Sequence, residues 1–288
     1  MPTNKFPVSC IKYFAILFLT LSLFTIFLLA LSLLALSYSN VSNGSLTFAQ
    51  TPLDQAKKDY TEKTSDLSNT KNAYITAKST YQAFGTATAK AEAFAKTKEY
   101  LISVDRLLLS YLALVSEYGS ETRWQSSSFN KAATDQVITD QITFMQDHLE
   151  KVQNTQTLEE LPPLSLDLKT RLDKDTRPKI NKVAETYDIA QTESIFGSFI
   201  NVSQLLNEFV EKRITAQNHT LLINWQSEIN DIREKTLTNL SLSKESYKKI
   251  KDDSFNSHQI KQTDEILERA KIELKRSKSL FEEMTKII

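Results

Sequence analysis

The 288-residue chain has little glycine, little proline and one cysteine. From Leu53 to the C-terminus it contains three glycines and three prolines, whereas average usage would give roughly 17 and 12 over that length. Sheet proteins need a turn about every 8–12 residues, and their turns draw on these two residue types. So few turn formers indicate few, long elements, and we predict an all-α fold.

Excess charge of either sign is also missing, because 35 Lys and Arg residues balance 35 Asp and Glu residues. A dedicated nucleic-acid binder needs a clustered excess of Lys and Arg to neutralise phosphates, so we expect no nucleic-acid partner. The single cysteine, Cys10, excludes a disulfide framework. It precedes the long apolar run rather than following it, so it is not placed for lipid attachment.

The usual enzyme and metal motifs do not occur in this sequence. It has no Gly-rich phosphate loop and no Gly-x-Ser-x-Gly nucleophile turn. None of the histidines, His148, His219 and His258, has a carboxylate three or four residues before it, which excludes the common helical di-iron and zinc patterns. We interpret all three as solvated surface residues.

Two short acidic stretches resemble the first residues of an EF-hand calcium loop, but neither has the residues that the later positions of that loop require. The first begins at Asp252 but has Ser257 where the loop needs Gly and Thr263 where it needs Glu. The second begins at Asp173 and has Pro178 at the Gly position. We therefore predict no catalytic, cofactor-binding or metal-binding residue and no enzymatic activity.

The N-terminal region has the pattern of a membrane-targeting segment. Residues 1–12 carry Lys5 and Lys12, and residues 13–38 then run for 26 positions without a charge. At about 1.5 Å per residue this run gives roughly 39 Å of helix, enough to cross a hydrocarbon core of about 30 Å. The flanking lysines predict a cytoplasmic N-terminus, so that the remainder of the chain lies outside the membrane.

The sequence does not decide whether this segment is retained or removed. Residues 13–38 are either a retained signal anchor or the apolar part of a cleaved signal peptide, because small residues favour a cut after Ala49. The protein is then a single-pass membrane protein or a secreted one. Residues 39–52 read as a flexible linker, and residues 53–288 as an extracytoplasmic helical bundle.

Helical periodicity organises residues 53–288. Larger side chains recur at steps of three and four from Leu53 to Phe84, as in helices that pack along an apolar seam. Beyond Gly85 the pattern resumes one residue early, so the chain either kinks or reverses there. The absence of Pro or Asp beside this glycine favours a kink.

The next segment, Leu101 to Val115, is apolar on every side except for Asp105 and Arg106. A helix that is apolar all round is buried all round, so this segment should form the centre of the bundle. An enzyme would need buried acid or base groups, but we interpret the two charges as an internal ion pair or as helix-edge residues. Gly119 is expected to end the helix.

Breaks in the pattern divide the remainder. We expect a helix over residues 129–155, capped from Ser126–Ser128 and ended by the Pro162-Pro163 pair. Another should start at Arg177-Pro178 with Thr176 as its cap. Whether that helix breaks near Asn218 stays open.

The last helix, over residues 257–287, has the most regular stripe in the chain. Its heptad positions combine large residues such as Leu267 and Leu274 with small ones such as Ala270 and Ser277. Extra apolar residues widen the stripe, so this helix should contact more than one neighbour.

Two surface features have a structural and a functional interpretation. The tyrosines Tyr60, Tyr74 and Tyr81 follow the heptad, so we interpret them as core, the alternative being an aromatic platform for a glycan or peptide. The lysines from Lys248 to Lys251 read as a solvated face, the alternative being contact with a membrane surface.

Strong periodicity without catalytic motifs predicts an elongated antiparallel bundle or coiled coil of about five to six helices, preceded by one N-terminal hydrophobic helix. We expect a non-enzymatic scaffold, spacer or adhesion component without a cofactor or small-molecule substrate. It would associate with the membrane through residues 13–38 and bind a protein partner or itself. The alternative is a helical ligand-sensing ectodomain that works with a partner membrane protein.

Overall fold

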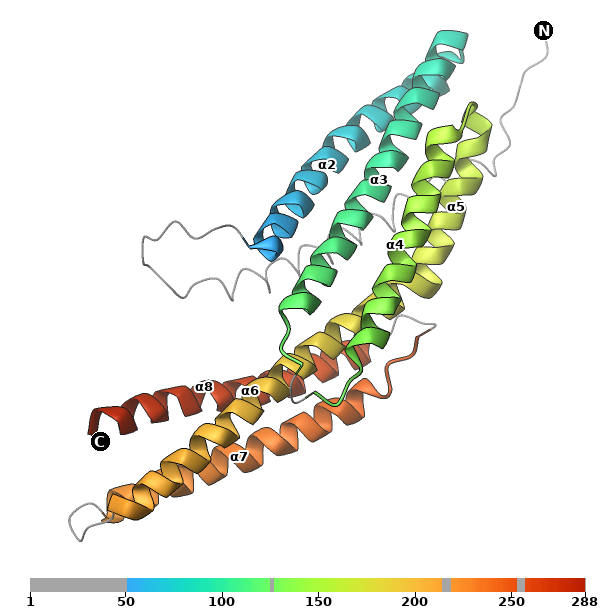
Figure 1. Cartoon of the computed structure of the whole chain (residues 1–288). Coiled ribbons are helices and arrows are strands. Elements are labelled where there is room, and N and C mark those ends of the chain that lie inside the picture. The colour runs from blue at the N-terminus through green and yellow to red at the C-terminus, as the bar shows by residue number, and fades with distance from the viewer. Residues whose placement is uncertain (1–50, 125–126, 214–218, 253–256, 288) are drawn as a thin grey trace. The chain divides into compact units, whose positions relative to one another are not determined.

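The computed structural model describes residues 51–287 except 125–126, 214–218 and 253–256 (Figure 1). These described residues form helices and no strand, so the predicted all-α fold is confirmed for them. The helices in chain order are α2 Pro52–Phe84, α3 Ala87–Glu121, α4 Lys131–Asn154, α5 Leu161–Arg171, α6 Arg177–Arg213, α7 His219–Tyr247 and α8 Ser257–Ile287.

The chain reverses at Gly85, so the expected kink is wrong. Gly85 ends α2 in the left-handed conformation, with φ 61°, and Thr86 begins α3 by accepting a hydrogen bond from the Ala89 N–H. α2 and α3 therefore lie side by side as a hairpin (Figure 1). Left-handed backbone is open to Gly at little cost, which is why one glycine is sufficient for the turn.

Aromatic side chains join the two arms of this hairpin. Tyr74 is buried, and its ring stacks on that of Tyr100 with 5.1 Å between the ring centroids. The ring of Tyr60 lies near that of Tyr111, with 6.0 Å between the ring centroids and a tilt of 51° between the ring planes. The core interpretation of the tyrosine series is confirmed for Tyr74.

Helix α3 does not end at Gly119 as expected, because it continues to Glu121. A Cβ atom at residue 119 would overlap the ring of Tyr187 on α6. This glycine therefore serves close approach between two helices rather than termination. The segment Leu101–Val115 is largely buried, as predicted, and Arg106 points to solvent.

The structure differs from the predicted N-cap of α4 and from the predicted role of the Pro162-Pro163 pair. Asn130, rather than one of the preceding serines, caps α4 by accepting the Ala133 N–H. Pro162 and Pro163 do not stop a helix but occupy the first turn of α5. A proline has no N–H to donate, and the first turn of a helix leaves that donor unused.

A π-helical turn, Leu172–Thr176, connects α5 to α6, so the two helices follow one another without a break. The Arg177 N–H donates to the Leu172 carbonyl, five residues back. This wider turn accommodates Pro178, which cannot continue a regular helical ladder. The prediction that Thr176 caps α6 is therefore wrong, because Thr176 is buried within the turn.

The remaining helices α6, α7 and α8 pack against one another. Contacts of α6 with α8 advance in the same direction along both helices, from Glu185 near Asp264 to Phe199 near Phe281, so these two helices are parallel. The Thr186 hydroxyl meets that of Tyr247, and further along α6 Phe199 packs with Trp225, so α7 runs the opposite way.

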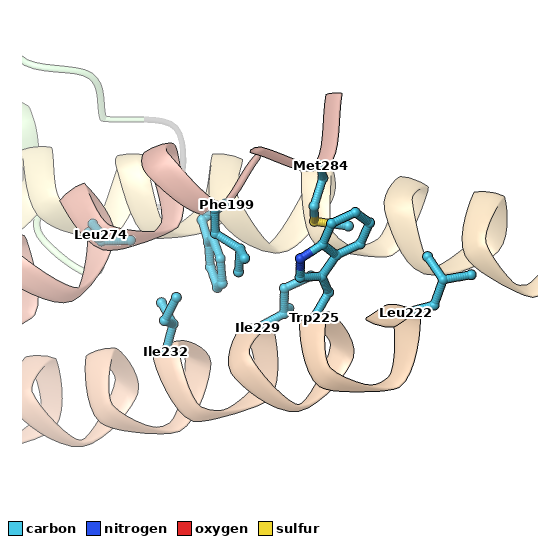
Figure 2. Close-up of a cluster of buried hydrophobic side chains, with 8 residues drawn as sticks. Phe199, Leu222, Trp225, Ile229, Ile232, Leu274 and Met284 are labelled. Carbon is cyan, nitrogen blue, oxygen red and sulfur yellow. The ribbon is translucent and has the colours of Figure 1, made fainter. Parts of the chain in front are cut away.

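An apolar cluster fills the space between these three helices. Figure 2 shows its side chains converging from α6, α7 and α8, and the buried members are Phe199, Leu222, Trp225, Ile229, Ile232, Leu274, Leu280 and Met284. The predicted bounds of α8 and the burial of its stripe, including Leu267 and Ala270, are confirmed.

Some expectations fall on residues that the structure does not describe. The apolar segment 13–38, the cut after Ala49 and the linker up to residue 50 lie outside the described residues. Pro52, expected in the linker, is the first residue of α2. Residues 214–218 lie outside too, although α6 and α7 on either side are separate helices in contact. Across the described ranges, no helix is both long and apolar enough to span a membrane.

Candidate functional site: a buried acid and histidine pair

The most distinctive chemistry lies inside the bundle, between α3 and α4. Asp105 and His148 have exposed fractions of 0% and 1%, so the prediction of a surface histidine is wrong for His148. The residue lies on the buried stripe of α4, between Met145 and Val152. Helical spacing therefore directs it toward α3 and toward the one acid in the apolar segment of α3.

Both ring nitrogens of His148 have partners. Nδ1 lies 2.9 Å from each carboxylate oxygen of Asp105, and Nε2 lies 3.1 Å from the backbone carbonyl oxygen of Leu164 on α5. A carbonyl oxygen can only accept, so Nε2 carries a hydrogen. The second proton is then shared between Nδ1 and the Asp105 carboxylate, and the pair as a unit is neutral.

Burial and pairing act in opposite directions on the two groups. Burial lowers the pKa of His148, but the hydrogen bond and negative charge of Asp105 outweigh it and raise that pKa above its ordinary value. Burial raises the pKa of Asp105, and the His148 contact offsets only part of that rise. Both shifts favour the protonated pair, which therefore retains its proton to a higher pH than a free histidine.

This pair is unsuited to acid–base catalysis. A catalytic histidine needs one ring nitrogen within reach of the substrate. Here both nitrogens bond within the chain and neither side chain reaches solvent. Asp105 is thus part of an internal ion pair, as one interpretation of the sequence held, and its partner is His148 rather than Arg106.

A second polar network lies along the same face of α4. The Gln141 side chain, which is fully buried, donates to Asp175 at 3.1 Å and accepts from the Thr176 hydroxyl at 2.7 Å. Asp175 also pairs with Lys179 and Arg171. Partial burial would raise the pKa of Asp175, but these partners lower it below its ordinary value. The network fixes the π-helical turn against α4.

A pair of carboxyl groups, Glu185 buried and Asp264 half-buried, joins α6 to α8. Glu185 is 5% exposed and is hydrogen bonded to Asp264, and its Oε2 atom has no hydrogen-bond partner. Burial, followed by the charge of Asp264 and its hydrogen bond, raises the pKa of Glu185 to about 10. Burial also raises the pKa of Asp264. Glu185 is therefore protonated at neutral pH, with Asp188 and Lys271 as charged neighbours.

The other candidate groups remain dispersed. His258 is exposed at the start of α8, as expected, while the side chain of His219 lies outside the described residues. Asp252 pairs with Lys182, and residues 253–256 of the failed calcium loop are not described. Within the described part of the chain, no group of three or more His, Cys, Asp or Glu side chains could hold a metal ion.

Comparison of the chain with protein-family models, with curated proteins and with solved structures found no match. What the protein does must therefore be inferred from its own residues and their packing.

The sequence carries a signal for the burial of His148. Buried residues on α4 follow steps of three and four through Ile138, Gln141, Met145, His148 and Val152. A histidine in register with an apolar stripe, in a chain with one acid in its most apolar segment, indicates an internal partner. The Glu185 and Asp264 pair had no comparable signal, since acids are common on helix surfaces.

Proposed function

We propose that the protein is a non-enzymatic scaffold, spacer or adhesion component that acts through protein contacts. One observation supports this most: the buried Asp105 and His148 pair engages both ring nitrogens and both carboxylate oxygens inside the chain. This acid–base pair thus contributes to packing and has no group left for a substrate.

The lengths of the helices fit a spacer. The arms α2 and α3 have 33 and 35 residues, which correspond to roughly 50 Å each at about 1.5 Å per residue. The proposal includes an elongated, antiparallel, coiled-coil-like bundle, because long paired helices span distance with few residues in loops. Small-angle scattering with light scattering on the full chain would test it, and a compact particle would contradict it.

The proposed location is outside the cytoplasm. Residues 13–38 would either anchor the chain in the membrane with its N-terminus inside or be removed by a cut after Ala49. Intact mass of the chain from membrane and medium fractions distinguishes a retained anchor from a secreted product. Protease added to intact cells should degrade the bundle, and protection of the bundle would contradict this location.

A thermal-shift screen separates the scaffold from the ligand sensor. A scaffold should show no stabilisation by small solutes, whereas a ligand that binds the folded state raises its melting temperature. Saturable stabilisation of a compact monomer by one class of solute would overturn the scaffold proposal.

A further inference from the structure

The C-terminal half of α6 has an apolar stripe that faces solvent. Ile195, Val202 and Leu205 have exposed fractions of 43%, 41% and 66%. With the exposed Ser198 they follow steps of three, four and three, which is the spacing of a coiled-coil seam. Exposed apolar patches are typical of surfaces that contact another protein, a membrane or a ligand.

The stripe is continuous with the core between α6, α7 and α8. The buried positions Phe199 and Ser203 are each one residue further along α6 than the exposed positions Ser198 and Val202. One residue turns the helix by about 100°, so the exposed row borders the buried row. Figure 2 shows the adjoining cluster around Phe199. A helix laid on the stripe would extend an existing apolar core.

The lack of charge on the stripe favours a second copy of this chain as the occupant. Residues 194–207 contain no charged side chain, so the matching surface must also be uncharged, because an unpaired charge buried against it would be costly. The exposed amides of Asn201 and Gln204 border the stripe, and an amide both donates and accepts. The stripe therefore complements itself, as a two-fold interface requires.

Two other exposed apolar residues lie among charges. Leu166 is followed by Asp167, and Ile272 lies between Lys271 and Glu273. Single apolar side chains among charges are normal on a soluble surface. They offer matched controls for the stripe.

We propose that two copies of the chain associate through the α6 stripe Ile195, Ser198, Val202 and Leu205. This inference rests on the proposed scaffold function and names its partner. Each copy would contribute the same seam to a shared helical interface, and the uncharged border would exclude partners with charged faces.

Cysteine cross-linking in the full chain tests the interface. The background variant Cys10→Ser has no thiol, and Ile195→Cys, Val202→Cys and Leu205→Cys each add one on the stripe. Mild oxidation of membranes and medium should give a disulfide dimer with at least one of the three, and far less with Leu166→Cys or Ile272→Cys. Asn201-Val202-Ser203 is an N-glycosylation triplet, so a host without that pathway is used.

A charge variant of the full chain provides the second measurement. Val202→Lys and Leu205→Lys should each weaken dimerisation by about tenfold to hundredfold in sedimentation experiments, since apolar burial is lost and a charge is desolvated. Their circular dichroism spectra should keep the helical content of the wild type, because both positions are exposed.

The negative outcomes are distinct. A wild-type chain that stays monomeric, or stripe cysteines that cross-link no better than the controls, overturns the interface. Dimers that survive both lysine substitutions reveal another surface, which overturns this inference but leaves the scaffold proposal standing. Saturable stabilisation of a monomer by a small solute overturns the scaffold proposal itself.

Discussion

Asp105 and His148 share a proton in a site closed to solvent, so their contribution to stability depends on both being present. Removing one partner from a buried pair leaves an uncompensated group, whereas replacing both with apolar residues is often neutral. Asn at residue 105 could accept the Nδ1 hydrogen, but the ring would then be neutral and Nε2 would present a lone pair to the Leu164 carbonyl.

We therefore expect Asp105→Asn to lower the free energy of unfolding by about 1–3 kcal/mol and His148→Leu by about 3–5 kcal/mol. The double variant Asp105→Leu/His148→Leu should recover most of that loss. Urea unfolding followed by circular dichroism measures all three. Single and double variants of equal stability would contradict the pairing.

The raised pKa of His148 also has a pH signature. A group whose pKa is raised on folding contributes stability below its unfolded pKa, near 6.5, and loses it as pH rises through the folded value. Wild-type stability should thus fall on the alkaline side, and the double variant should lack that part of the fall.

Glu185 gives the largest pH effect expected from a single residue. Its pKa is raised from 4.5 to about 10, so the folded state binds more protons than the unfolded state between these values, and stability falls as pH rises through that window. Gln mimics the protonated acid. We expect Glu185→Gln to be stabilised by on the order of 1–3 kcal/mol at pH 8, and by less at pH 5.

Thermal melts at both pH values measure that difference. Lys182→Gln on the same helix is the control, because its ion pair with Asp252 is near the surface and of little energetic weight. A stabilisation by Glu185→Gln that is independent of pH would show that Glu185 does not retain its proton on folding.

At the scale of elements, the reversal between α2 and α3 depends on one backbone conformation. Gly85 has φ 61° and no other atom within 4 Å of a Cβ built on it, so a substitution there meets backbone strain but no steric overlap. Gly85→Ala should cost about 1–2 kcal/mol, and Gly85→Asn less, because Asn tolerates the left-handed region. Equal melting temperatures for the two variants would contradict this account.

Helix α8 offers a matched pair of positions two residues apart. Leu274 is 7% exposed within the apolar cluster, and Ile272 is 58% exposed. Leu274→Asp loses about 1.5–3 kcal/mol of burial and adds an unpaired charge, so α8 should detach. Ile272→Asp should leave stability almost unchanged. Hydrogen exchange of α8 amides distinguishes the two, and equal protection would show that the stripe is not core.

At the scale of the whole described chain, Tyr187 connects two groups of helices, α2–α5 and α6–α8. Its fully buried ring packs on Gly119 and Trp124, and its hydroxyl donates to Asp135 at 3.3 Å. Helices α3, α4 and α6 thus meet at one side chain. The contact explains why a glycine stands in the last turns of α3.

We expect Tyr187→Ala to cost about 3–5 kcal/mol and to divide thermal unfolding into two transitions, because α6–α8 retain their own core when this contact is lost. Tyr187→Phe keeps the ring and should cost about 1 kcal/mol with a single transition. Calorimetry separates these outcomes, and one transition for Tyr187→Ala would show that other contacts couple the groups.

Much of the fold was predictable because the periodicity of apolar side chains is local. The bounds of α8 follow from steps of three and four along the helix, and the burial of most of Leu101–Val115 follows from its apolar composition on every side. The reversal at Gly85 and the use of Pro162 to begin a helix were not predictable in this way. One glycine or proline is compatible with a kink, a turn or a helix start, and contacts between distant residues select among them.

The candidate site was also predictable only where its signal is local in the sequence. Asp105 stood out because a charge within an apolar helix needs a partner, but the sequence around Asp105 does not identify that partner, because His148 lies 43 positions away on another helix. The sequence by itself determined which faces of the helices are apolar, since that depends on neighbours along one helix. Only the tertiary structure decided which polar groups share a proton, because burial and pairing arise where α3 meets α4 and where α6 meets α8.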